Sequence, residues 1–343
     1  MRKQYINFLK FVSILFVILI HLLSKAWNTT AVNSSTFKVL TFIDILFLVC
    51  VPIFVMCSGA IFLNRNDGIK KILFKYILKI YLIFIIFNSL YKIADIIMYH
   101  DQIINIKLLF NILKESVLLK NIYHLWYLKV VMAVYLTTPL LKALIKIKYK
   151  HIDFVILALL LIIFKGLPIL IKSSSFITFN SLFGFTIYYF LGYLLDKYKN
   201  KKLIYYLIPL SIIAYCYSYI TTINDSIITG SGSVKFLQYQ SFNIMIISIL
   251  FFALASYYRN IFEKDKIKKF LEFEAKYNFN IYLLHGFVIG LLSYLKVINL
   301  YDYHFVPIIF LYLIYVYVIS FICGFMLKSI TEKFKNIIKK SII

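Results

Sequence analysis

Residues 5–23 read YINFLKFVSILFVILIHLL, an apolar stretch long enough to cross a bilayer as a helix. It nevertheless contains two ionisable side chains, Lys10 and His21. Their separation corresponds to about three helical turns, so both lie on one helix face, about 16 Å apart along the axis. Asn7 lies one turn before Lys10, close to the same face. Because lipid cannot satisfy polar groups, this polar stripe must face another helix or a wet cavity.

An ionisable side chain at membrane depth is by default a candidate functional residue. The alternative for this helix is a histidine at the outer interface and a lysine whose ammonium reaches the inner interface. We do not expect a signal peptide, because the run is too long, contains Lys10 and ends in HLLSKAW without a small-residue cleavage site. The segment is therefore predicted to be a retained helix.

Composition predicts that the whole chain is a polytopic membrane protein. Of its 343 residues, 62% are hydrophobic and 15% are charged, and the mean hydropathy is +0.86. The net charge of +24 does not indicate nucleic-acid binding, because the charges lie in short clusters between apolar spans, where they set topology and contact membrane lipids. All four cysteines lie inside apolar spans without metal-ligand spacing, so we expect them to be packing residues.

The hydropathy pattern predicts an all-α transmembrane bundle that forms one integral membrane domain over residues 1–343. Ten spans are expected, at residues 5–23, 37–63, 72–98, 122–144, 152–171, 181–196, 203–220, 236–258, 277–295 and 305–327. Lys and Arg favour alternate ends and loops, since 27 of the 38 lie within residues 2–10, 65–79, 142–150, 197–202, 259–276 and 328–340. Because positively charged loops stay inside, both termini are predicted to be cytoplasmic in a multi-pass plasma-membrane protein.

Three further segments carry local predictions. Residues 104–120, INIKLLFNILKESVLLK, predict an amphipathic helix on the outer surface. Residues 261–276, which include EKDKIKKFLEFEAK, predict a cytoplasmic counterpart in which the two charge signs alternate. In the second span, Pro52 and the pair Ser58-Gly59 predict a bent helix, with a packing kink that has no function as the alternative.

Few titratable groups lie within the spans. Asp44 enters the membrane at a depth comparable to that of His21, because the second span runs inward from the outer side. A carboxylate beside a histidine fixes its tautomer and stabilises the imidazolium, which is the usual arrangement for a general base. The alternative is a boundary aspartate that faces lipid headgroups.

Two more histidines are candidates. His124 opens the segment HLWYL at the outer surface, where Trp126 and Tyr127 alone would be ordinary interfacial aromatic residues. A histidine beside them, at the depth of His21, is less ordinary. His285, in NIYLLHGFVIG, lies deeper, and its alternative is a core histidine bonded to a neighbouring carbonyl.

Four motifs occur in order along nearly the whole chain. They are the spacing of ten residues between Lys10 and His21, VPIFVMCSG at 51–59, HLWYL at 124–128 with TTPLL at 137–141, and IYLLH at 281–285. Together they resemble the acyltransferase-3 family, whose members are bacterial-type integral membrane acyltransferases that modify cell-surface sugars. The family usually has Arg at the position of Lys10, so the charge is kept and the bidentate fork is lost. In place of a family pair of Arg at the inner end of the third span, this chain offers only Lys75 and Lys79, at a different spacing.

The resemblance implies transfer of an acyl group, commonly acetyl, from cytoplasmic acyl-CoA to a hydroxyl of an extracytoplasmic surface glycan or its lipid-linked precursor. Acyl-CoA would be a donor substrate, and no permanently bound cofactor is expected. The donor would lie along the polar stripe of the first helix. The residues expected to bind it are Lys10, Asn7, Lys75 and Lys79.

The resemblance also implies roles at the outer side. His21 would be the general base that deprotonates the acceptor hydroxyl, with Asp44 and His124 as the other catalytic candidates. Trp126, Tyr127 and His285 are expected to bind substrate. Thioester transfer needs no metal, and no His or Cys spacing indicates one.

A transporter or flippase for a lipid-linked saccharide or an acyl carrier is the rival hypothesis, since it would use the same polar stripe as a permeation path. A sensor or scaffold without catalysis is a third. The placement of His124 beside LWYL at one surface favours the enzyme, because a transporter has no need of it.

Overall fold

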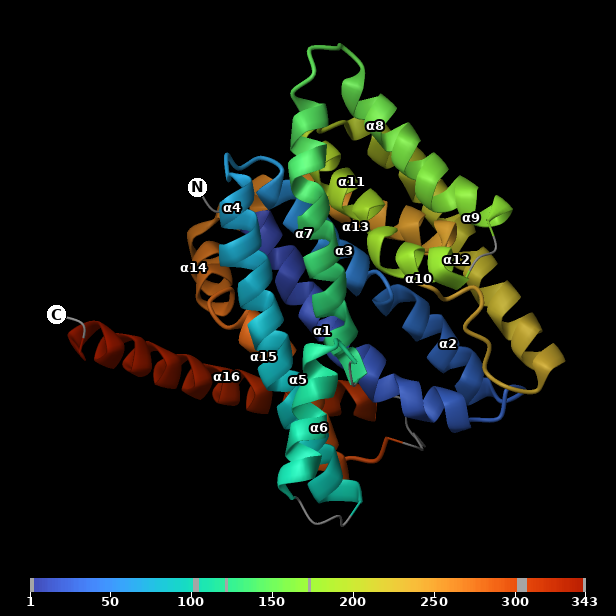
Figure 1. The fold of residues 1–343 in the computed structure, drawn as a ribbon. Coiled ribbons are helices and arrows are strands. Elements are labelled where there is room, and N and C mark those ends of the chain that lie inside the picture. Colours follow the sequence, from blue (N-terminus) through green and yellow to red (C-terminus); the bar gives the residue numbers. More distant parts are fainter. Residues whose placement is uncertain (1–2, 101–104, 121–122, 172–173, 301–306, 342–343) are drawn as a thin grey trace. The chain divides into compact units, whose positions relative to one another are not determined.

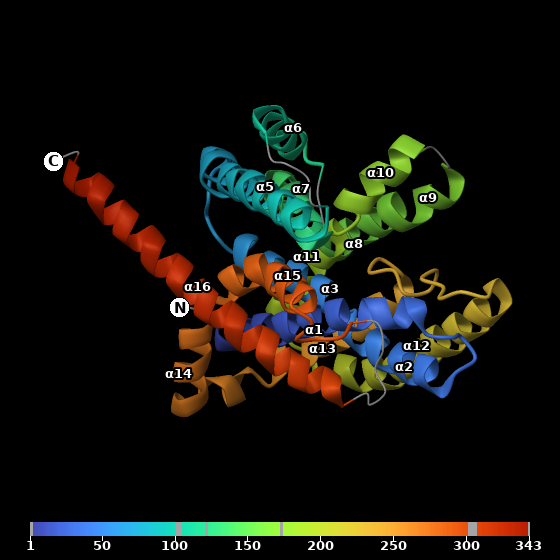
Figure 2. The ribbon, with the colours of Figure 1, turned by 90° about the horizontal axis from the view of Figure 1, so that it is seen from below.

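The computed structural model describes residues 3–341 except 101–104, 121–122, 172–173 and 301–306. Within this part of the chain every regular element is a helix and there is no strand (Figures 1 and 2). The all-α prediction is therefore confirmed. Among the described residues, six helical stretches are long and apolar enough to span a membrane, namely Gln4–Thr29, Ser35–Phe62, Ile69–Tyr99, Trp126–Ile145, Lys201–Thr229 and Ile308–Lys333.

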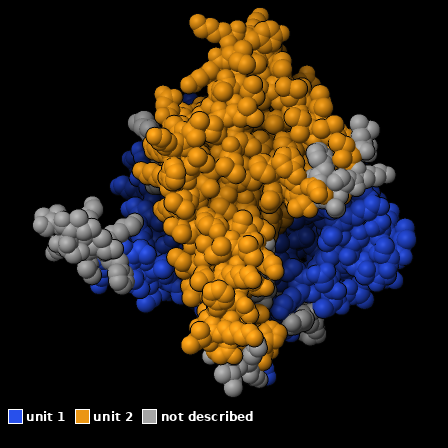
Figure 3. Space-filling view, viewed as in Figure 1, with its two compact units in different colours: residues 1–50, 213–238, 258–343 blue, residues 51–212, 239–257 orange. Residues whose placement is uncertain are grey.

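The chain divides into two compact units (Figure 3). Unit 1 comprises residues 1–50, 213–238 and 258–343. It contains α1 (Gln4–Thr29), α2 (Ser35–Phe47), the second part of α12 (Lys201–Thr229), η4 (Arg259–Glu263), α14 (Asp265–Glu274), α15 (Asn278–Tyr294) and α16 (Ile308–Ser341).

Unit 2 comprises residues 51–212 and 239–257. Its helices up to α7 are α3 (Cys50–Phe62), α4 (Ile69–Lys71), η1 (Ile72–Ile77), α5 (Leu78–Tyr99), α6 (Ile106–Val117), η2 (Tyr123–Leu125) and α7 (Trp126–Ile145). The others are α8 (Ile152–Leu161), η3 (Ile162–Gly166), α9 (Leu167–Leu170), α10 (Ser174–Phe183), α11 (Thr186–Lys197), the first part of α12, and α13 (Phe242–Tyr257).

The first helix organises unit 1, because α1 packs against α2, α14, α15 and α16. Ile14, Ile18 and Leu22 are fully buried at intervals of four residues, which is the spacing of one helix face. Near its end, the buried Trp27 Nε1 donates to Thr41 Oγ1 of α2 over 2.8 Å. This helix is the one that the sequence predicted from its first apolar segment.

Unit 2 is built around α11, in which every residue from 186 to 196 is buried. A helix that is covered on all sides needs close neighbours, and between helices in lipid the attraction comes from packing rather than from hydrophobic burial. Two glycines allow the approach. A Cβ on Gly59 would lie 1.6 Å from the Tyr189 carbonyl oxygen, and one on Gly192 would lie 2.0 Å from the Met56 carbonyl oxygen. The backbones of α3 and α11 therefore cross in contact.

The second predicted span is interrupted, as Pro52 predicts. The break lies at Leu48 and Val49, where α2 ends and a turn precedes α3. Proline has no N–H to donate to the carbonyl four residues earlier, which is that of Leu48. Ser58 and Gly59 instead lie inside regular helix, and Gly59 serves the crossing with α11.

Both predicted surface helices are present. In unit 2, α6 packs beside α5 through an ion pair of 2.5 Å between Lys92 and Glu115 and a hydrogen bond of 2.9 Å from Asn88 to Ser116. In unit 1, α14 packs beside α1. The membrane side on which each helix lies stays a prediction.

Six of the ten predicted spans fall on the six long apolar stretches. The other four fall on shorter or interrupted helices. Residues 152–171 hold α8, η3 and α9 in succession, 181–196 hold the end of α10 and most of α11, and 236–258 and 277–295 hold α13 and α15. The total of ten spans and the cytoplasmic position of the termini stay predictions.

Candidate functional site

His21 and His285 face each other within unit 1. The ring of His21 on α1 and the ring of His285 on α15 have centroids 5.4 Å apart, with planes inclined by 36°. His285 is fully buried, and its Nδ1 lies 2.7 Å from the Tyr282 carbonyl oxygen one turn earlier on the same helix. A carbonyl only accepts hydrogen bonds, so Nδ1 of His285 carries a proton and donates it.

This bond fixes the chemistry of the other His285 nitrogen. With Nδ1 protonated, the Nε2 of a neutral ring is a hydrogen-bond acceptor. One ring nitrogen of His21 and one of His285 lie within 4.8 Å of each other, a separation that a single bridging water spans. Through such a water, His285 Nε2 can accept a hydrogen bond from one protonated ring nitrogen of His21. The other ring nitrogen of a neutral His21 is then unprotonated and can act as a base.

Asp44, predicted to assist His21, lies elsewhere in unit 1. It is half-buried on α2, and no hydrogen bond or ion pair joins it to His21 among the residues that the structure describes. Its carboxyl group instead interacts electrostatically with Tyr215 of α12, whose hydroxyl donates to the Phe42 carbonyl oxygen. The structure thus brings His285 to His21 and does not bring Asp44 there.

At the other end of α1, Asn7 belongs to a chain of side-chain amides. Asn7 is buried, and its Nδ2 donates to Gln4 Oε1 over 2.9 Å. Gln4 Nε2 in turn donates to Glu272 Oε1 of α14 over 2.8 Å. The chain ties the start of α1 to α14, so the polar stripe predicted from the sequence does face a neighbouring helix.

Lys10 lies beside a buried carboxylate that the sequence analysis missed. Glu274, the last residue of α14, is 1% exposed, and its Oε1 accepts from Asn278 Nδ2 over 3.1 Å. The same Asn278 amide donates to the Lys10 carbonyl oxygen over 3.1 Å. Burial raises the pKa of Glu274 to about 7, against the opposing effects of the Asn278 hydrogen bond and the charge of Lys10.

The signal for Glu274 was present in the alternation of residues 263–276. Leu271, which is buried, and Glu274 are three residues apart, so they share one face of α14. A glutamate on the apolar face of an amphipathic helix is unusual, because burial of a carboxylate without full pairing is costly.

Lys75 and Lys79 are exposed in unit 2 and make no hydrogen bond or ion pair with any described residue. The basic residues that do gather there surround Asp67 in the turn before α4. Arg65 is 3.2 Å from the Asp67 carboxylate, Lys71 also pairs with it, and Tyr76 and Lys142 bond to its side chain and carbonyl respectively. The hydrogen bond from Lys71 lowers the pKa of Asp67.

The motif at the start of α7 forms an aromatic cluster in unit 2. His124 is 4% exposed, and its ring meets that of Tyr91 edge to face at 5.2 Å. Trp126 is half-buried and lies 5.6 Å from the ring of Tyr239. Tyr127, the next residue of the helix, is also half-buried. The arrangement gives His124 a fixed ring orientation and leaves part of Trp126 accessible.

Comparison with known proteins identifies the family to which the chain belongs. The family model of the acyltransferase-3 group, described as an acyltransferase domain, matches residues 3–325. No curated protein and no solved structure matches the chain. The matched residues include both ends of the α1 polar stripe, the aromatic motif of α7 and the histidine of α15. The chain therefore belongs to the acyltransferase-3 family of membrane acyltransferases.

Proposed function

We propose that this protein is an O-acyltransferase that moves an acyl group, in the first instance acetyl, from cytoplasmic acyl-CoA to a hydroxyl of a surface glycan or its lipid-linked precursor. The observation that carries the proposal is the facing pair of His21 and His285 on the family's motifs. We treat residues 1–343 as one functional domain of the plasma membrane, with both termini cytoplasmic as the distribution of Lys and Arg indicates.

In the proposed reaction His21 accepts the proton of the acceptor hydroxyl while that oxygen attacks the thioester carbonyl. The carbon–sulfur bond then breaks, the acyl ester forms, and the coenzyme A thiolate takes up the proton. A base within hydrogen-bond reach of the hydroxyl typically contributes a factor on the order of 10² to 10⁴ in rate. His285 holds His21 in the tautomer that can accept this proton, a role that was predicted for Asp44 from the sequence.

The donor phosphates are assigned to the inner end of the α1 stripe. Lys10 supplies the cation there and Asn7 an amide, with the exposed Lys75 and Lys79 as further donor-binding residues. At the acceptor side we assign sugar binding to Trp126 and Tyr127, because half-buried aromatic rings offer faces on which a sugar can stack. His124 and Asp44 remain catalytic candidates, and mutation compares His124 with His21.

The function is tested by following label from acyl-CoA into membrane glycan in sealed vesicles that contain the purified protein. Covalent ester formation that is lost in His21→Asn, at equal protein level, supports the enzyme. Movement of a lipid-linked saccharide across the bilayer without any ester product identifies a transporter or flippase and overturns the proposal.

A further inference from the structure

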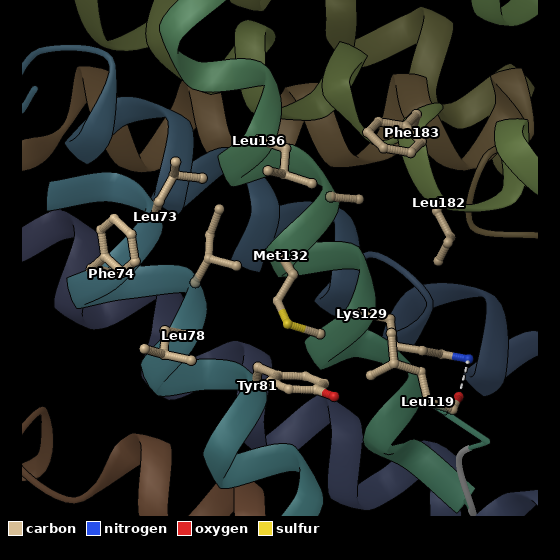
Figure 4. Close-up of a pocket in the computed structure, with 12 residues that line it drawn as sticks. Leu73, Phe74, Leu78, Tyr81, Leu119, Lys129, Met132, Leu136, Leu182 and Phe183 are labelled. Atoms are coloured by element: carbon tan, nitrogen blue, oxygen red, sulfur yellow. Dashed lines mark hydrogen bonds between the residues drawn. The ribbon is translucent and has the colours of Figure 1, made fainter. Parts of the chain in front are cut away.

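An open groove of about 510 Å³ lies within unit 2 (Figure 4). One side is formed by η1 and the start of α5, the floor by α7, and the other side by the end of α10. The side chains that line it are almost all hydrocarbon, among them Leu73, Leu78, Met132, Leu136, Leu182 and Phe183. Leu136 is 50% exposed and Leu78 is 42% exposed, so the groove presents these side chains outward. A water-soluble ligand would gain little from such a lining, whereas a hydrocarbon chain matches it.

Of the described residues that line the groove, Lys129 is the one that carries a charge. Its ammonium donates to the Leu119 carbonyl oxygen over 3.3 Å (Figure 4). No carboxylate pairs with it anywhere in the described part of the chain. The hydroxyl of Tyr81, a second polar group among the described lining residues, is bonded to the Val117 carbonyl oxygen over 2.9 Å. The Lys129 ammonium lies on a membrane-spanning helix and, among the described residues, has only the Leu119 carbonyl group as a partner. Burial of a cation that is not fully paired is costly, so an anion from outside the chain would be bound favourably here.

The residue whose carbonyl accepts from Lys129, Leu119, has an unusual backbone conformation. Leu119 adopts the left-handed conformation, with φ of 59°, directly after α6, at a point where glycine is the usual residue. This conformation is sterically unfavourable for leucine. It closes the C-terminal turn of α6, in which the Lys120 N–H donates to the Glu115 carbonyl oxygen over 2.9 Å. The Leu119 carbonyl accepts from Lys129, and the Leu119 side chain lines the groove.

The order of groups along α7 points to the kind of lipid. Trp126 and Lys129 are three residues apart, so they lie on neighbouring positions of one helix side. Met132 and Leu136 continue into the apolar groove. From the start of α7 onward the helix thus offers an accessible aromatic ring, then an ammonium, then hydrocarbon. A lipid-linked saccharide has the same order, which is a sugar, then phosphate, then a long hydrocarbon tail.

We propose that this groove binds the tail of a lipid-linked saccharide and that Lys129 pairs with the phosphate that joins the tail to the sugar. The inference rests on the proposed function, because it identifies the lipid-linked precursor as the acceptor. A phospholipid of the surrounding bilayer lacks the sugar that the Trp126 ring would receive, so it accounts for the groove and the lysine only.

The test uses a photoreactive prenyl monophosphate with the full-length protein in phosphatidylcholine vesicles, without any donor. Illumination is expected to label peptides of α5 and α7, and unlabelled prenyl phosphate should compete far better than phosphatidylglycerol. Lys129→Gln should reduce labelling about tenfold, because a charged hydrogen bond is lost, and Lys129→Arg should retain it. Leu136→Trp should also reduce labelling by filling the groove. Its matched control is Leu159→Trp, at an equally exposed leucine on α8 of the same unit that does not line the groove.

Labelling that is unchanged in both Lys129→Gln and Leu136→Trp overturns the inference. Equal competition by phosphatidylglycerol also overturns it, because the groove would then be a site for bulk lipid. Since labelling requires no turnover, its outcome is independent of the proposed reaction. Normal labelling without ester formation counts against the enzyme, and ester formation without specific labelling counts against the groove.

Discussion

His21 and His285 are 264 residues apart in the chain, yet their rings face each other at 5.4 Å within one compact unit. His285 Nδ1 donates a hydrogen bond to the Tyr282 carbonyl, so in the neutral ring Nε2 is the nitrogen that can accept a hydrogen bond. In the proposed reaction the half-buried His21 is the base and the buried His285 orients it.

The first prediction concerns His285. His285→Ala should lower kcat for acyl transfer by about tenfold or more, and by less than the loss of the base itself, while the KM for the acceptor stays near its original value. The midpoint of the pH–rate curve should shift as well, because the neighbour of His21 has changed. A raised acceptor KM with unchanged kcat would instead make His285 a substrate-binding residue, and a lower kcat with an unmoved midpoint would make its role structural.

The second prediction concerns Lys10. Lys10→Ala should raise the apparent KM for acyl-CoA about tenfold or more, because a charge-assisted contact with phosphate is lost. Lys10→Arg should be tolerated or should bind the donor more tightly, since the guanidinium offers a planar fork. Lys25→Ala, at an exposed lysine on the same helix, is the control. Unchanged donor affinity in Lys10→Ala would show that the α1 stripe does not bind the donor.

The third prediction concerns Glu274 and pH. Its pKa in the folded protein is about 7, above the ordinary value of 4.5, so the folded state favours the protonated form. The stabilising contribution of this proton is complete below pH 4.5 and is lost as the pH rises through 7. Glu274→Gln should therefore gain up to about 3 kcal/mol over wild type at pH 8 and little at pH 5, measured by thermal unfolding in detergent. Glu332→Gln, at an exposed carboxylate, should show no such difference. Equal effects of Glu274→Gln at both pH values would contradict the assignment.

The fourth prediction concerns the crossing of α3 and α11. Gly59→Ala places a methyl group against the backbone carbonyl of Tyr189, where no side-chain movement can relieve the clash. We expect destabilisation of about 3 kcal/mol or more, seen as a loss of folded protein in fluorescence-detected size exclusion. Gly166→Ala is the matched control, because nothing lies within 4 Å of the position of its Cβ. Equal recovery of the two variants would mean that the helices can separate without cost.

The local features of this structure could be predicted from the sequence. The length and apolar content of residues 5–23 correctly predicted α1, and Pro52 correctly predicted that the second span is not one straight helix. The pair Ser58-Gly59, expected to contribute to the bend, lies in regular helix. The sequence could not show that α11 is covered on all sides, because that depends on which helices surround it. The contact of His21 with His285 and the burial of Glu274 beside Lys10 are equally tertiary, since both join segments far apart in the chain. A single sequence shows that each residue is unusual at its position and does not show its partner.

The last prediction separates His21 from His124 as the base. His21→Ala and the nearly isosteric His21→Asn should both lose activity by a factor on the order of 10² to 10⁴ while the protein still folds. The wild-type rate should rise with pH through one ionisation, because only neutral imidazole accepts a proton. His124 packs edge to face against Tyr91 and lies two residues before Trp126, so His124→Asn should chiefly raise the KM for the acceptor glycan. The measurement is acyl transfer to membrane glycan at matched protein level across both histidine series. If His21→Asn keeps more than about a tenth of wild-type turnover while His124→Asn loses it, His124 is the base, because the residue whose imidazole cannot be replaced by an amide is the one that carries the proton.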